Sequence, residues 1–191
     1  MVTSLKELID TLKALLYLTP VYGNRMALVG GSGGESVAIA DAFIKAGLEV
    51  PLLTQKSYEE LATFFNLVGA SYRNPIDPGM NWGHIRSILE IVAQDPNIDS
   101  IAVHMFFASH LLPPELLDNL INTVINMREN GSKPIMAIVP YLSSPEDMTQ
   151  AKDIAQKFQG SGIPTFDSVE WAAQALRNAL DYSSFKNSIT E

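Results

Sequence analysis

A glycine-rich turn between an apolar run and a helical pattern is the part of the sequence most suited to chemistry. The apolar run 26–29 ends in Gly30-Gly31-Ser32-Gly33-Gly34, and the helical pattern begins at once. In such a turn, free backbone N–H groups and the positive end of a helix dipole converge, and glycines leave no Cβ between backbone and ligand. We therefore expect an anion, above all a phosphate group, at six consecutive residues: Gly31, Ser32, Gly33, Gly34, Glu35 and Ser36. The alternative is a turn whose glycines only let helix and strand pack closely.

The residues around the turn narrow the kind of phosphate ligand. A dinucleotide-binding fingerprint needs a third glycine where this chain has Ser36, and an acidic residue after the next strand, where it has Thr54 and Gln55. No Gly-Lys-Ser/Thr follows the glycines, which excludes a P-loop. A free-standing FMN protein would carry more hydroxyl groups in this loop than Ser32 and Ser36 provide. The sequence therefore disfavours NAD and FMN as ligands.

Composition sets further limits on function. The chain has 191 residues, enough for one ordinary domain, with 47% hydrophobic residues and a net charge of −8. This charge, without a basic patch, argues against nucleic acid, and no apolar run is long enough to cross a membrane. There are no cysteines, and His84, His104 and His110 lack metal-ligand spacing, so we expect no metal site. Acidic residues interrupt the N-terminal segment too early for a signal peptide, so we expect a cytoplasmic protein.

Strands and helices alternate from residue 26 onward. We expect strands at 26–29, 50–53, 99–106, 134–139 and 164–166, and helices at 35–46, 57–67, 83–94, 114–130 and 167–182, with another from 145. The 99–106 run is nearly all apolar, as in strands covered on both faces. The pattern predicts an α/β fold, a three-layer α/β/α, flavodoxin-like, doubly wound parallel sheet of five strands in the order 2-1-3-4-5. A helix over 4–17 precedes it, and we divide the chain into a connector helix and linker (1–22), a domain (23–183) and a tail (184–191).

Ligands of such sheets bind at the edge where the strands end. Besides the glycine turn, that edge would hold the turn Asn74-Pro75-Ile76-Asp77 and the residues that follow the 99–106 strand. We expect four polar side chains to line a pocket there: Asn74, Asp77, Ser109 and His110. Asn74 and Asp77 equally suit a purely structural turn, and His110 a plain loop position. His104 lies within the predicted strand and is expected to be a core residue.

Six segments in a fixed order resemble one known family. They are VGGSGGESVAIADAFIKAGLEVPLL, SYEELATFF, NPID, DPNIDSIAV, KPIMAIV and GIPTFDSVEWAAQAL, and they span about residues 20–182. Together they resemble one domain of the NDP-forming acyl-CoA synthetases of the succinyl-CoA synthetase superfamily. The domain is similar to the third domain of the single-chain form, which is related to the C-terminal domain of the succinyl-CoA synthetase β subunit.

The resemblance implies a role for the glycine turn. In that family an acyl phosphate, a phosphohistidine and ATP or GTP are linked in sequence, and helix N-termini of two flavodoxin-like domains meet the phosphohistidine loop. Gly33 and Gly34, with the helix that begins near Glu35, would form one of those two ends. Asn74, Pro75 and Asp77 match an Asn-Pro-x-Asp turn of the family, and Asp41 matches an aspartate of its first helix.

The chain also departs from the family pattern. It has no Ser-Gly-His-x-Gly-Ala segment, so it lacks the phosphorylated histidine, and Glu35 and Ser36 stand where the family usually has Pro and Gly. We therefore expect no catalytic residue, no bound cofactor and no activity in this chain alone. CoA, ATP or GTP, and Mg²⁺ are implied for the complete enzyme, with CoA-binding and ATP-grasp domains or subunits as partners. The alternative is a non-catalytic binding or interaction module that has lost the ligase chemistry, which the Glu35 carboxylate favours.

The predicted helix 4–17 has one apolar face. It begins with a Ser4-x-x-Glu7 capping box, and its large aliphatic residues are Leu5, Leu8, Ile9, Leu12, Leu15 and Leu16. An exposed face of this size is unfavourable in water. We expect it to be covered by the domain itself, by a second copy in a homodimer, or by a partner.

Overall fold

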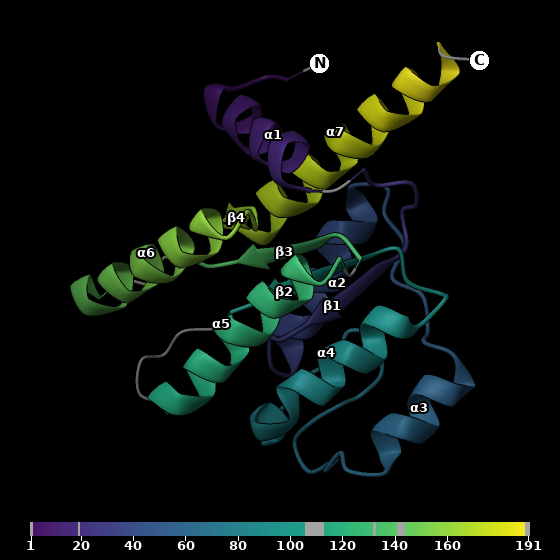
Figure 1. The fold of residues 1–191 in the computed structure, drawn as a ribbon, viewed down its shortest axis with the longest axis vertical. Helices are drawn as coiled ribbons and strands as arrows, with labels where there is room; N and C mark the ends of the chain where they lie inside the picture. Colours follow the sequence, from purple (N-terminus) through teal and green to yellow (C-terminus); the bar gives the residue numbers. More distant parts are fainter. Residues whose placement is uncertain (1, 19, 106–112, 132, 141–143, 190–191) are drawn as a thin grey trace.

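Four short parallel strands lie at the centre of the fold (Figure 1). They are β1 (Met26–Val29), β2 (Ser100–His104), β3 (Ile135–Ile138) and β4 (Thr165–Phe166), in the sheet order β1-β2-β3-β4. The computed structural model describes residues 2–18, 20–105, 113–131, 133–140 and 144–189, and all residues of these strands are buried. The predicted α/β class with a parallel sheet is confirmed.

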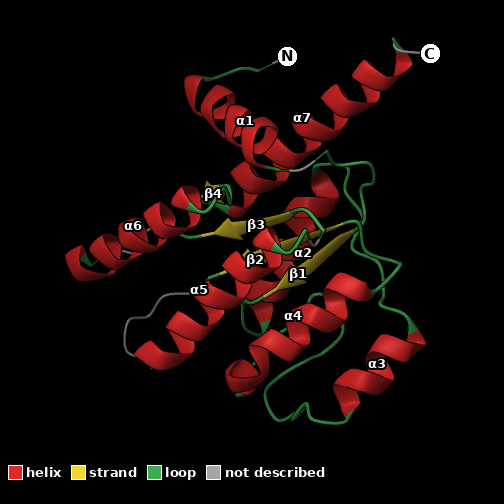
Figure 2. Ribbon diagram, in the orientation of Figure 1, coloured by secondary structure: helices red, strands yellow, loops and turns green. Residues whose placement is uncertain are grey.

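Helices cover both faces of the sheet (Figure 2). The described residues form α1 (Leu5–Tyr17), α2 (Gly34–Lys45), α3 (Gln55–Ala62), α4 (Ile85–Gln94), α5 (Pro114–Glu129), α6 (Pro145–Gly160) and α7 (Val169–Ser188), with a short 3-10 helix η1 (Asn81–His84) before α4. α4 shows why these segments are helical, because its buried residues Ile85, Ile88, Leu89 and Val92 recur at the spacing of one helix face. The result is the predicted three-layer arrangement, with α1 packed on the outside of α7.

Strands β1, β2 and β3 each supply residues to two separate cores. In β1, Ala27 and Val29 belong to the core that also contains buried residues of α3, α4, α5 and α6. Met26 and Leu28 belong to the other core, shared with α1, α2 and α7. This alternation follows from the two-residue period of a strand, and it explains why β1 and β3 are apolar at every residue.

The prediction of a fifth strand at 50–53 is wrong for the described sheet, which has four strands. Apart from the pairing of β1 with β2, the described residues form two isolated bridges to the β1 segment, Arg25 with Glu49 and Val29 with Ile76. Pro51 lies between them and has no N–H to donate to a neighbouring strand. The sheet therefore lacks the second strand of the predicted order 2-1-3-4-5, and its four strands follow the rest of that order, 1-3-4-5.

The side chain of Asn74 takes the place of that strand beside β1. Its Oδ1 accepts the Leu28 N–H at 3.0 Å, and its Nδ2 donates to the Met26 carbonyl at 2.7 Å. The same Nδ2 donates to the Pro51 carbonyl at 2.8 Å. One buried carboxamide thus satisfies backbone groups that a strand would otherwise pair.

Several helix ends differ from the predicted ones. α3 begins earlier than the predicted helix 57–67 because Thr54, and not Ser57, is its N-cap: the Thr54 side chain accepts the Ser57 N–H. The helix also ends earlier, at Ala62. Ser168, rather than Asp167, caps α7, which continues to Ser188, beyond the predicted end at 182. Among the described residues, no helix has the length and apolar character needed to cross a membrane.

Candidate functional site

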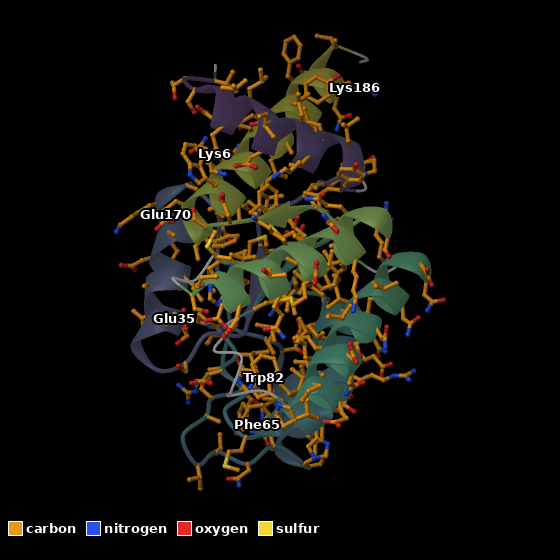
Figure 3. All side chains as sticks on the ribbon, turned by 90° about the vertical axis from the view of Figure 1, so that its left-hand side faces the viewer. Lys6, Glu35, Phe65, Trp82, Glu170 and Lys186 are labelled. Atoms are coloured by element: carbon orange, nitrogen blue, oxygen red, sulfur yellow. The ribbon has the colours of Figure 1, made fainter. Side chains whose placement is uncertain are left out.

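The glycine turn joins β1 to α2 at the edge where the strands end. Figure 3 looks toward this edge, and Glu35 is labelled there at the start of α2. Gly30 and Gly31 have φ of 106° and 76°, in the left-handed region that favours glycine. A Cβ on Gly30 would lie 2.1 Å from the His104 carbonyl oxygen of β2, so the turn is held tightly against the neighbouring strand.

Two backbone N–H groups of the turn are bound to carboxylates of the chain itself. The Gly33 N–H donates to Asp77 Oδ2 at 2.9 Å, and the Ser32 N–H donates to Glu35 Oε2 at 3.3 Å. Ser36 Oγ donates to the Gly33 carbonyl at 2.7 Å and so closes the first turn of α2. The turn therefore holds anionic oxygens, and it is the chain's own acidic side chains that provide them.

The turn Asn74-Pro75-Ile76-Asp77, which we call the proline turn, is hydrogen-bonded to the glycine turn. The Ile76 carbonyl accepts the Gly30 N–H at 2.9 Å, and the Ile76 N–H donates to the Leu28 carbonyl at 2.8 Å. Asp77 Oδ1 also accepts the Gly79 N–H at 3.0 Å, so its carboxylate bridges two loops. Asp77 thus lies at the glycine turn, whereas the Asn74 carboxamide is engaged with the backbone beside β1.

His104 is a residue of this edge that the sequence analysis placed in the core. It is the last residue of β2 and is buried, and its Nε2 lies 3.9 Å from Glu35 Oε1. Burial lowers the pKa of His104 below its ordinary value, and the nearby Glu35 carboxylate opposes that shift only in part. Its position at the end of the predicted strand could have indicated this place, because parallel strands end at the same edge and β1 and β2 are neighbours.

The remaining predicted site residues are distributed as follows. Ser109 and His110 lie outside the described residues. Asp41 lies on α2 with its side chain 62% exposed, near Lys45 rather than near the glycine turn. Within the described parts of the chain, no group of three or more side chains could hold a metal ion.

Comparison with known proteins indicates which enzymes this chain is related to. No family model matches the sequence. The chain is 32% identical over 161 residues to the acetate–CoA ligase [ADP-forming] II subunit alpha of Pyrococcus furiosus, covering 80% of this chain and 32% of that protein. It thus spans about a third of the length of this curated relative.

Solved structures agree with this relationship. PH0766 from Pyrococcus horikoshii superposes with a TM-score of 0.73 at 25% identity, covering 95% of this chain and 41% of that one. The dinucleotide-forming acetyl-coenzyme A synthetase 1 of Candidatus Korarchaeum cryptofilum, in its apo form and in complex with phosphate and ADP, has the same fold. Its TM-score is 0.76 at 20% identity, over 98% of this chain and 39% of that one. The sequence and the fold together confirm the predicted resemblance of this chain to the NDP-forming acyl-CoA synthetase superfamily.

Proposed function

We propose that this chain is a non-autonomous domain of an NDP-forming acid–CoA ligase. In this role, the glycine turn and the N-terminus of α2 bind a phosphoryl group that a partner domain presents. The observation that carries the proposal is the pair of N–H···carboxylate contacts at Ser32 and Gly33, because donors that bind carboxylate oxygens can also bind phosphoryl oxygens.

The two carboxylates are held to different degrees. Asp77 is buried, and its backbone pairs with Ser71 in both directions, at 2.8 and 2.9 Å. The Glu35 side chain is 33% exposed and makes a single long contact, at 3.3 Å, with the turn. We infer that an incoming phosphoryl oxygen replaces Glu35 at the Ser32 N–H and leaves Asp77 in place.

Stabilisation at this turn is electrostatic. The N-terminus of α2 carries about half a positive charge, and the N–H groups stabilise phosphoryl charge without being consumed. Glu35 opposes an anion until it moves away from the Ser32 N–H, and in the present structure its Oε1 lies 3.9 Å from His104 Nε2. CoA, the nucleotide and Mg²⁺ would be bound by the partner domains, and this chain's residues only orient the phosphoryl group.

A second function is favoured by the same two carboxylates. If Glu35 and Asp77 hold the turn permanently, the domain has kept the fold and lost the phosphate site. It would then act as a binding or interaction module of the same assembly. The two functions differ in whether an added anion reaches the Ser32 N–H.

Phosphate titration followed by backbone amide chemical shifts tests the proposal. We expect shifts centred on residues 31–36 at millimolar phosphate, and affinity roughly three- to tenfold higher in Glu35→Gln, because one negative charge is removed close to the site. Asp41→Asn is the matched control: it removes the same charge from α2 at an exposed position and should leave the affinity unchanged. Shifts centred elsewhere, or none in either variant, would favour the interaction module.

A further inference from the structure

The N-terminal helix α1 packs on the fold with its polar face inward. Figure 1 shows α1 lying against α7 at the end of the molecule away from α3. The buried residues of α1 are Glu7, Asp10 and Ala14, two of which are acidic. An amphipathic helix that packs on its own domain normally buries its apolar face, so this orientation needs a reason.

Polar contacts hold the inward face. Asp10, which is 1% exposed, lies between Lys6 at 2.9 Å and Lys13 at 2.8 Å. Lys6 also reaches Asp167 at 2.7 Å, and Lys13 donates to the Thr165 carbonyl of β4 at 3.3 Å. These ion pairs and hydrogen bonds join α1 to the sheet edge beside α7.

A second set of contacts joins α1 directly to α7. Asn178 of α7 donates to Thr11 Oγ1 at 2.9 Å and to Glu7 Oε1 at 3.4 Å. Glu7 also accepts from the backbone N–H and hydroxyl of Thr3, both at 2.7 Å. The polar side chains of α1 are thus engaged within the chain, and the orientation of the helix is fixed.

The outward face of α1 is a continuous aliphatic stripe. We define the α1 stripe by its six exposed residues: Leu5 (73%), Leu8 (41%), Ile9 (47%), Leu12 (46%), Leu15 (37%) and Leu16 (73%). From these fractions it exposes on the order of 600 Å², the size of the largest apolar patches on monomeric proteins. It continues into a groove of about 260 Å³ that Leu15, Tyr22 and Tyr182 help to line.

The composition and spacing of the α1 stripe match a second copy of itself. Leu5, Leu8, Leu12 and Leu15 are separated by 3, 4 and 3 residues, an order that is the same in both directions. In an antiparallel pair, Leu8 of one copy therefore lies opposite Leu12 of the other, and each contact occurs twice, as a two-fold interface requires. The stripe carries no charge that would repel its own image.

The apolar area of the α1 stripe is also large enough for a dimer interface. Two stripes would bury about 1,200 Å² in total, the lower end of the range for specific interfaces. The net charge of −8 disfavours association of two copies, but at about 0.1 M salt this repulsion is largely screened beyond about 10 Å. We propose that the α1 stripe is the interface of a two-fold homodimer in which the two α1 helices pair antiparallel. This proposal is independent of the phosphate site.

Sedimentation equilibrium of the full chain at increasing concentration and salt tests the proposal. We expect a reversible dimer that is tighter at higher salt, and a monomer with an unchanged circular dichroism spectrum for Leu8→Glu/Leu12→Glu. Ile44→Glu is the matched control, because Ile44 is an aliphatic residue on α2 that is 55% exposed, and it should leave the dimer intact. A wild-type chain that stays monomeric throughout, or a double variant that still dimerises, would overturn the proposal.

Cross-linking tests the orientation, since the chain has no cysteine of its own. A mixture of Leu8→Cys and Leu12→Cys chains should form the mixed disulfide in preference to either homodimeric disulfide. Preferential disulfides within each single variant would indicate a parallel pair and reject the antiparallel arrangement. Wild-type chain that binds lipid vesicles and remains monomeric would show that the stripe serves another surface.

Discussion

The Asp77 carboxylate accepts the Gly33 N–H at 2.9 Å and thereby joins the proline turn to the glycine turn. The two residues are 44 positions apart in the sequence and lie at the same sheet edge. Because Asp77 also accepts the Gly79 N–H, its removal would leave two N–H groups without their carboxylate. The conformation of the glycine turn thus depends on a residue of another loop.

Asp77→Ala should destabilise the chain by about 2 kcal/mol, because two hydrogen bonds to a charged group are lost. Urea unfolding measures the change. Acetate or phosphate should partly restore the stability of this variant by occupying the freed Gly33 N–H, with a smaller effect on the wild type. Asp41→Ala, at an exposed position, should change stability by less than about 0.5 kcal/mol. Equal effects of the two substitutions would show that Asp77 does not support the turn.

Two glycines of the turn should respond oppositely to alanine. Gly30→Ala places a Cβ 2.1 Å from the His104 carbonyl at a φ of 106°, so we expect a loss of about 3 kcal/mol or more. Gly34→Ala meets no atom within 4 Å and lies in the first turn of α2, so stability should stay the same or rise by less than about 1 kcal/mol. Thermal unfolding of both variants checks this, and similar melting temperatures would contradict the tight packing of the turn on β2.

Asn74→Asp should be among the most destabilising conservative substitutions. The new carboxylate keeps the acceptor for Leu28 but loses the Nδ2 donor and faces the Met26 and Pro51 carbonyls. We expect a loss of about 3 kcal/mol at neutral pH, because the site is buried. The loss should diminish in acid, where a protonated carboxyl can donate again. Asn126→Asp, on the exposed surface of α5, is the control and should show neither effect.

Acid should weaken the fold through Asp95 and Asp99. Burial by itself raises the pKa of Asp95, but hydrogen bonds from Ser57, Thr54 and Asn97 outweigh it, and the pKa is lowered. The Arg25 guanidinium, which binds Asp99 at 2.6 and 2.9 Å, lowers the pKa of Asp99. Both groups bind protons more weakly in the folded state. Their stabilisation is therefore present above about pH 4 and is lost as the pH falls from there through the folded pKa values.

Urea unfolding between pH 7 and pH 3 measures this dependence. Asp99→Asn should flatten the acid limb of the stability curve, whereas Asp41→Asn should leave it unchanged because Asp41 is exposed. An acid limb that is the same in all three proteins would exclude Asp99 as a contributor.

The isolated chain should form no acyl-CoA. The sequence has no phosphohistidine segment, and the chain spans about a third of its curated relative. Incubation with ATP or GTP, Mg²⁺, CoA and short-chain acids should yield neither thioester nor phosphorylated protein. Turnover by the pure chain would contradict its assignment as a non-autonomous domain.

The sequence by itself determined the parallel α/β class and the position of the glycine turn. The runs that form β1 and β3 are apolar at every residue, which indicates strands covered on both faces, and Gly30–Gly34 follows β1 directly. These features depend on neighbouring residues and on periodicity, so local patterns suffice to predict them. The family resemblance was visible for the same reason, in short segments of fixed order.

The tertiary structure decided which groups meet. Residues 50–53 are apolar enough for a strand, but the Asn74 side chain, brought in from another loop, takes the place beside β1. His104 comes close to Glu35 only because β1 and β2 are neighbours that end at the same edge. The periodicity of α1 revealed an apolar face but not the direction in which it points. That direction was set by contacts with Asp167 and Asn178, more than 150 residues away, which no local pattern encodes.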